Sequence, residues 1–103
     1  MFADTSDHAR VLHKLYSELS STVDAQTVAR YMFQHNELTK RDLDSIQSRR
    51  GKPIRSAERL LDIVMEQPHS VYWCFLDALT EAGHDDLRRI IIFETPEGQL
   101  NVS

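Results

Sequence analysis

Apolar residues recur at three- and four-residue spacing through most of the chain, which is the pattern of amphipathic helices. The pattern is most regular in residues 53–83. Pro53 suits a first helical position, and Pro68 cannot continue the helix that starts there. Ser70 suits the N-cap of the next helix, and Gly83 suits the position just past its end. We therefore predict two helices here, with these inward residues: Ile54, Ala57, Leu60, Leu61 and Val64 in the first; Val71, Phe75, Ala78, Leu79 and Ala82 in the second.

Two such stripes need further helices to cover them, and the rest of the chain supplies four. They are predicted over about residues 7–20, 25–34 and 40–48 and from Asp85 onward, with Asp24 and Thr39 as N-caps. The run at residues 90–93 also fits a buried strand, but no other segment would pair with it, so we predict helix. The expected inward residues are Leu12, Leu15 and Leu19, with Val11 and Tyr16 at the edges; Ala25, Val28, Ala29 and Met32, with Tyr31 or Phe33 at the margins; Leu43 and Ile46; and Leu87, Ile90 and Ile91.

The predicted fold is all-α, a six-helix antiparallel bundle built as one domain over residues 1–93. A chain of 103 residues is long enough for one modest core. Residues 94–103 include Pro96 and Gly98 and show no periodicity, so we expect a tail or linker there.

Charge is distributed unevenly along the chain, whose formal net charge is −4. Residues 40–59 hold seven bases and three acids, whereas residues 60–103 hold two bases and eight acids. A chain with one basic and one acidic segment can dock copies or relatives of itself by charge complementarity. The same balance argues against general binding to polyanions.

Catalytic and metal-binding patterns are missing from the sequence. The five histidines (His8, His13, His35, His69 and His84) include no pair four residues apart, so we predict scattered surface or turn positions and no metal or cofactor. Cys74 is the only cysteine and lies near the edge of an apolar helix face, where a small buried thiol is common. Together with the lack of a nucleophile elbow, P-loop or dinucleotide motif, this predicts that the domain is not an enzyme.

The compartment is expected to be the cytoplasm. A single cysteine allows no internal disulfide, which agrees with a reducing setting. The first ten residues lack the pattern of a secretory signal, and no apolar run approaches the ~20 residues of a membrane span.

Three motifs follow one another in a recognisable order: YMFQHNELTKRDLDSIQS at residues 31–48, RSAERLLDIV at 55–64 and VYWCFLDALTEAGHDDL at 71–87. In this order the chain resembles a caspase recruitment domain (CARD), a branch of the death-fold superfamily, over about residues 9–91. It departs from the family pattern at Gln67-Pro68-His69 and at Trp73, a position that is usually polar.

The resemblance implies a six-helix bundle of Greek-key topology whose first helix is often kinked. It also implies homotypic CARD–CARD association with an adaptor, sensor or caspase in apoptotic or inflammatory signalling, often through filaments and without nucleic acid or membrane. A basic face of one domain would meet an acidic face of another. The matching basic positions are Arg10, Lys14, Arg55 and Arg59, extended by Arg49 and Arg50; the acidic candidates are Asp24, Glu37, Asp42 and Asp44.

The residues themselves leave alternatives open at these positions. Helical periodicity places Arg55 and Arg59 away from the apolar stripe, but Arg59 would also be explained by an ordinary surface pair with Asp62. Asp24 doubles as a helix cap, as Asp42 does in a capping box. Helical periodicity predicts that Trp73 is exposed and serves as an additional contact. The alternative is that it folds over a neighbouring helix or the C-terminal tail and fills a satellite core.

Two other functions compete with a free-standing interaction module. The domain would serve equally well as the non-catalytic prodomain of a caspase or as the leading module of a larger sensor. A small nucleic-acid-binding domain would use Lys40, Arg41, Arg49, Arg50 and Lys52, but the net charge of −4 counts against it.

Overall fold

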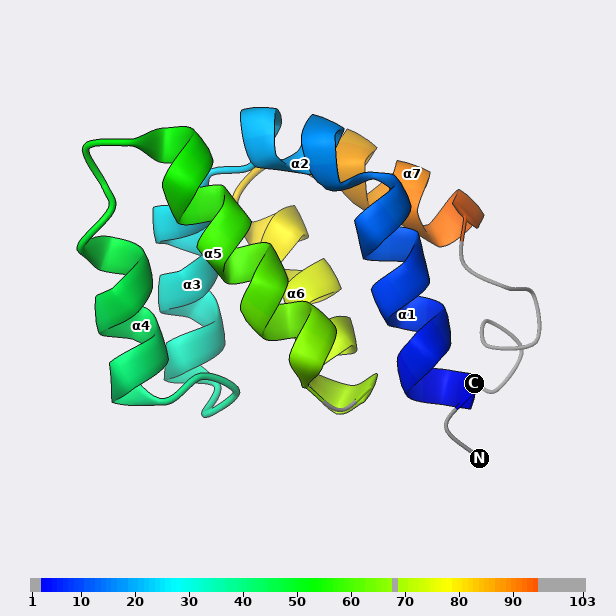
Figure 1. Cartoon of the computed structure of the whole chain (residues 1–103), viewed down its shortest axis with the longest axis horizontal. Helices are drawn as coiled ribbons and strands as arrows, with labels where there is room; N and C mark the ends of the chain where they lie inside the picture. Colours follow the sequence, from blue (N-terminus) through cyan, green and yellow to red (C-terminus); the bar gives the residue numbers. More distant parts are fainter. Residues whose placement is uncertain (1–2, 68, 95–103) are drawn as a thin grey trace.

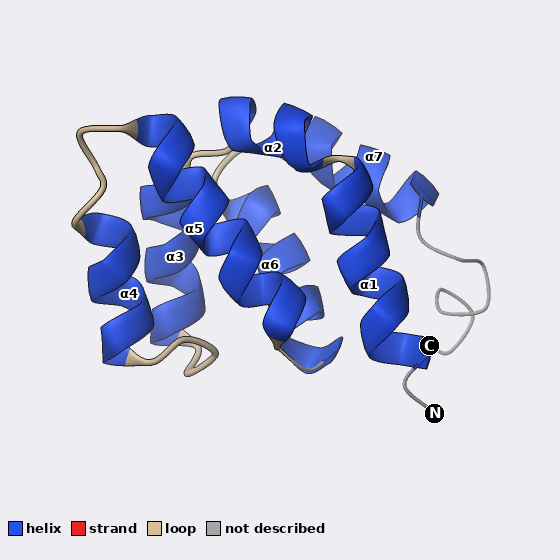
Figure 2. Cartoon of the chain, viewed as in Figure 1, coloured by secondary structure: helices blue, strands red, loops and turns tan. Residues whose placement is uncertain are grey.

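The computed structural model of the chain describes residues 3–67 and 69–94, and within these ranges all regular structure is helical (Figure 2). The all-α prediction is therefore confirmed, including a helix over residues 90–93. The helices are α1 (Ala3–Lys14), α2 (Tyr16–Thr22), α3 (Ala25–Gln34), α4 (Lys40–Gln47), α5 (Pro53–Glu66), α6 (His69–Glu81) and α7 (Asp85–Glu94). The predicted tail begins at Glu94, which the structure instead places at the end of α7, and residues 95–103 lie outside the described residues.

The helix predicted over residues 7–20 is two helices that meet at Leu15, whose φ and ψ are −99° and 11°. This break is the kink that the family resemblance implied. No proline or glycine marks it, so the local sequence gives no sign of the change in direction. Beyond the break, α2 runs across one end of α5 (Figure 1).

Helices α5 and α6 form the centre of the bundle (Figure 1). Helix α5 packs against α1, α2, α3 and α4, while α6 packs against α1, α3, α5 and α7. Apart from Ile54 and the half-buried Ala82, the predicted stripes of these two helices are buried. Because neighbours surround both helices, the core also takes Ile63, Tyr72 and Leu76, which lie beside the stripes.

Ile54 is the clear error in the predicted core, since it is 52% exposed. The apolar stripe of α5 continues to Ile54, but the covering helices leave this first turn open. A second correction concerns Ser70: α6 already begins at His69, so Ser70 lies in its first turn and is not the N-cap.

The predicted caps at the other helix ends are confirmed. The side chain of Asp24 accepts a hydrogen bond from the Thr27 N–H, and that of Thr39 accepts one from the Asp42 N–H. Gly83 has a φ of 83° and closes α6, where the His84 N–H reaches the Leu79 carbonyl.

Asn36 closes α3 in the same way, with a φ of 62°. The Glu37 N–H donates to the Met32 carbonyl and the Asn36 N–H donates to the Phe33 carbonyl, which is the Schellman arrangement. This closure fixes the backbone of residues 35–37 at the end of α3.

Among the described residues, no helix is long and apolar enough to cross a membrane.

Candidate interaction surfaces

The basic residues of α1 lie on an exposed side of that helix. Arg10 and Lys14 are one turn apart, and both are exposed. The ammonium of Lys14 reaches the Glu94 carboxylate at the end of α7, with Nζ and Oε1 2.8 Å apart. Lys14 is thus directed toward α7. The predicted basic face combines residues of α1 and α5, and these two helices do pack against each other.

The two arginines of α5 occupy different environments. Arg55 is exposed in the first turn of the helix. Arg59 is half-buried, and its Nε donates to the Ser45 hydroxyl of α4 at 2.9 Å. The alternative pair with Asp62 is not formed in the described part of the chain, where the Asp62 carboxylate accepts a hydrogen bond from the Tyr16 hydroxyl at 3.0 Å.

The segment that we call the basic turn, residues 48–55, comprises the connection from α4 to α5 and the first three residues of α5, and all eight residues are exposed. Successive backbone hydrogen bonds hold this segment, including one from the Lys52 N–H to the Arg49 carbonyl at 2.8 Å. The basic turn carries Arg49, Arg50, Lys52 and Arg55 and no acidic residue.

A buried polar contact anchors the basic turn to the bundle. Ser56 is only 1% exposed, and its hydroxyl donates to the Ile46 carbonyl at 2.9 Å. The Gln26 amide of α3 donates to the same hydroxyl, also at 2.9 Å. Helices α3, α4 and α5 therefore meet at Ser56. This buried hydrogen-bond network holds the adjacent basic turn in a fixed position.

The Tyr16 hydroxyl joins α2 to the middle of α5. It donates to Asp62 at 3.0 Å and lies 3.3 Å from the Glu58 carbonyl. Partial burial and the hydrogen bond to Asp62 raise the pKa of Tyr16 to about 12. The phenol is therefore protonated at neutral pH and helps to hold α2 on α5.

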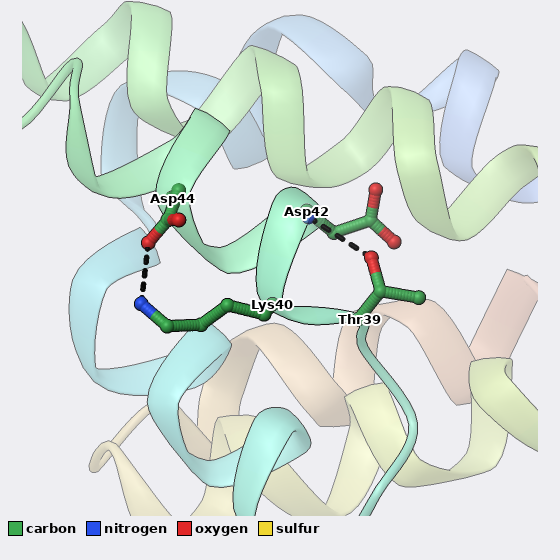
Figure 3. A network of polar contacts seen from close by, with 4 residues as sticks. All are labelled: Thr39, Lys40, Asp42 and Asp44. Atoms are coloured by element: carbon green, nitrogen blue, oxygen red, sulfur yellow. Dashed lines mark hydrogen bonds and ion pairs between the residues drawn. The ribbon is translucent and has the colours of Figure 1, made fainter.

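Most of the predicted acidic residues have a local structural role. Asp24 caps α3, and its backbone N–H also donates to the His84 Nε2 at 2.9 Å, joining the start of α3 to the turn before α7. Asp44 pairs with Lys40 one turn earlier, at 2.9 Å, and Asp42 lies in the capped first turn of α4 (Figure 3). Residues 40–44 of α4 therefore carry two bases as well as two acids.

Glu37 is different, because no hydrogen bond or ion pair joins its carboxylate to another described residue. It lies close enough to Cys74 of α6 for its charge to act there. Burial, followed by the charges of Glu37 and Asp77, raises the pKa of the Cys74 thiol to about 11. Cys74 is thus a half-buried, protonated thiol, as expected of a packing residue.

Tyr31 of α3 and His35, the residue that follows the helix, stack on one another, with ring centroids 4.2 Å apart. Partial burial and then the charges of Asp77 and others, including Glu81, raise the pKa of Tyr31. Asp77 and Glu81 are exposed on α6. We call Tyr31, His35, Glu37, Asp77 and Glu81 the aromatic–acidic surface.

Sequence reasoning missed the α6 part of this surface. Asp77 and Glu81 are visible as polar positions on an outer helix face, but the sequence does not show that α3 lies beside that face. The gathering of these carboxylates around Tyr31 depends on tertiary packing of α3 on α6.

Trp73 is less exposed than predicted. It is half-buried, packs against the core and meets the Tyr72 ring edge-on at 5.7 Å. The exposure predicted from helical periodicity is wrong, whereas the half-buried ring agrees with the alternative that it packs over its neighbours. Whether Trp73 also contacts a partner stays a prediction.

The surface or turn position predicted for His8 is also wrong. Its ring is fully buried and stacks on Tyr72, with centroids 5.0 Å apart. His13 and His35 are exposed, as expected, and the side chain of His69 lies outside the described residues. Among the described residues, no group of three or more histidine, cysteine and acidic side chains is placed to hold a metal ion.

Comparison with known proteins identifies the family. The sequence model of the caspase recruitment domain matches residues 4–94, nearly the whole chain. This match confirms the resemblance that the three ordered motifs indicated, and the helical bundle agrees with the death fold. A search of curated proteins finds no match to this chain.

Proposed function

The chain belongs to the caspase recruitment domain family of the death-fold superfamily, whose members are protein-interaction modules, and on this premise we propose how it binds its partners. It recruits other CARD-containing proteins, and copies of itself, through a basic and an acidic face. Adaptors, sensors and caspases of apoptotic or inflammatory signalling in the cytoplasm are the partner class. The domain acts as a scaffold and not as a catalyst.

The observation that carries the proposal is the exposure of the basic turn. Among the described residues, no hydrogen bond or ion pair joins Arg50 or Arg55 to another side chain, and nothing covers them. Arg55 also lies in the first turn of α5, which has no acidic residue. A cation near the positive end of a helix dipole is locally unfavourable, so folding stability does not explain its presence. Such local conflicts are expected at functional sites.

The arrangement of the two faces supports repeated assembly. The basic turn follows α4, whereas the acidic candidates lie at the start and end of α3 and on α4. A contact between two different surfaces of one molecule leaves one surface of each kind free at the ends of the assembly. Copies then add in one direction, and an open filament forms if the rotation does not close a ring.

The experiment compares wild-type protein with the Arg55→Glu variant in light scattering, alone and with a panel of purified CARDs. We expect wild-type assembly that weakens as salt is added, because exposed charges are screened. We expect the variant to lose assembly while keeping its helical circular dichroism. Arg55 is a cleaner probe than Arg59, since Arg59 also bonds α4.

Arg41→Glu is the matched control. Arg41 is also an exposed arginine in the first turn of a helix, but that turn contains the acidic Asp42, and Arg41 is outside the proposed basic face. The control should assemble like wild type. Normal assembly of Arg55→Glu, or no assembly of wild type with itself or any CARD, would contradict the proposal.

A further inference from the structure

The basic turn combines charge with an exposed apolar side chain. Ile54 is 52% exposed and is, with Phe93, one of two large hydrophobic residues exposed in the described part of the chain. Lys52 and Arg55 flank it closely in sequence, and Arg49 and Arg50 precede it in the same turn. The turn lies at one end of the long axis of the molecule (Figure 1). A surface that fits it offers carboxylates around an apolar or aromatic contact.

The aromatic–acidic surface of α3 and α6 has this chemistry. The stacked rings of Tyr31 and His35 provide a flat contact, with an interplanar angle of 28°. Glu37 and Glu81 carry no ion pair within the described residues. Asp77 has only a loose one, with its Oδ1 3.9 Å from Arg88. The negative charge on this surface is therefore largely available to a partner.

We propose that the basic turn of one copy docks on the aromatic–acidic surface of a second copy. Ile54 packs against the Tyr31–His35 stack, and the arginines approach Glu37, Asp77 and Glu81. This docking rests on the proposed function, and it identifies which acidic residues of one copy contact the basic turn of the next. Because the two surfaces differ, the contact is head-to-tail.

The acidic residues of α4 are weaker candidates for the receiving surface. Asp44 already pairs with Lys40 (Figure 3). Arg41, which follows Lys40 in the sequence, adds a second base to the start of the helix. An approaching arginine would meet cations there as well as anions, which lowers complementarity. Asp24 is used by its own helix, through Thr27.

Charge reversal within one chain tests the assignment by sedimentation velocity at low salt. Arg55→Glu alone should lose self-association. Adding Glu81→Arg to it should recover most of the assembly, since the sign of both surfaces is then exchanged. Adding Asp44→Arg instead is the matched control and should recover none.

The apolar part of the contact has its own matched pair. Ile54→Ser should weaken self-association about fivefold, because it removes an apolar contact from the interface. Phe93→Ser, at the other exposed hydrophobic residue, should leave self-association unchanged. Equal effects of the two variants, or none at Ile54, would overturn the role of Ile54.

The outcomes separate this inference from the proposed function. The docking site would be overturned if Asp44→Arg restored assembly, whether or not Glu81→Arg also did, or if neither change restored it. In each of these cases, loss of assembly in Arg55→Glu alone would still support the basic face. Failure of wild type to assemble with itself would overturn self-docking. Failure with every CARD as well would overturn the proposed function.

Discussion

The two sides of α5 are fixed by different physical demands. On one side Leu60, Leu61 and Val64 are completely buried. On the other, Arg55 faces solvent in the first turn of the helix, where the helix dipole disfavours a cation. The first side is explained by the stability of the bundle. The second is not, which is why we assign it to association.

Leu60→Ala, on the buried side, should have the largest effect on stability. The side chain is fully buried between helices, so truncation loses transfer free energy and leaves a cavity. We expect a loss of about 2–5 kcal/mol in the free energy of unfolding, measured by urea denaturation. If Leu60→Ala lowered the unfolding free energy no more than a substitution at an exposed position does, the core around α5 would not be packed as described.

Ser56→Ala should have an intermediate effect. Ser56 is adjacent to Arg55, but its hydroxyl is buried and bonds Ile46 and Gln26. Removing it leaves buried polar groups with fewer partners and should cost about 1–3 kcal/mol of unfolding free energy. Ser48→Ala, at an exposed serine of the same region, is the control and should cost far less; equal costs would refute the buried network.

Tyr16→Phe should cost about 1 kcal/mol, because the phenol bonds Asp62 across the α2–α5 contact. The cost should also depend on pH. The pKa of Tyr16 is raised from 10.0 to about 12, so its contribution is complete below pH 10 and is lost as pH rises through about 12. Urea denaturation of both proteins across this range should show their difference in unfolding free energy shrinking. A constant difference would contradict the raised pKa.

Arg55→Glu should have the smallest effect on stability, and of opposite sign. The new carboxylate would lie near the positive end of the dipole and one turn before Arg59. We expect a gain of about 0.3–1 kcal/mol in unfolding free energy, measured as above. A clear loss would mean that Arg55 supports the fold and would remove the contrast between the two sides.

The sequence predicted the buried side of the molecule better than its charged surface. Periodicity and cap residues were sufficient for the helices, their ends at Asp24, Thr39 and Gly83, and most of the core. Ile54 was misplaced because periodicity cannot show where a covering helix ends. No residue near Leu15 indicates the break between α1 and α2, and only the family resemblance predicted a kink in the first helix.

The candidate surfaces depended on contacts that sequence spacing cannot give. The prediction named Glu37 but not Asp77 or Glu81, because α3 and α6 are far apart in sequence and adjacent in the fold. It also assigned Asp44 to a partner and left Arg59 to a partner or to Asp62, whereas the fold pairs Asp44 with Lys40 and bonds Arg59 to Ser45. Tertiary contacts therefore decide which charges remain for a partner.

The central claim is that the exposed side of α5 serves association and not folding. The most direct test measures the unfolding free energy and the sedimentation velocity of the same Arg55→Glu sample, beside wild type and Arg41→Glu. Our account predicts an Arg55→Glu protein at least as stable as wild type that no longer assembles, while Arg41→Glu assembles normally. Stable Arg55→Glu protein that assembles like wild type would contradict it.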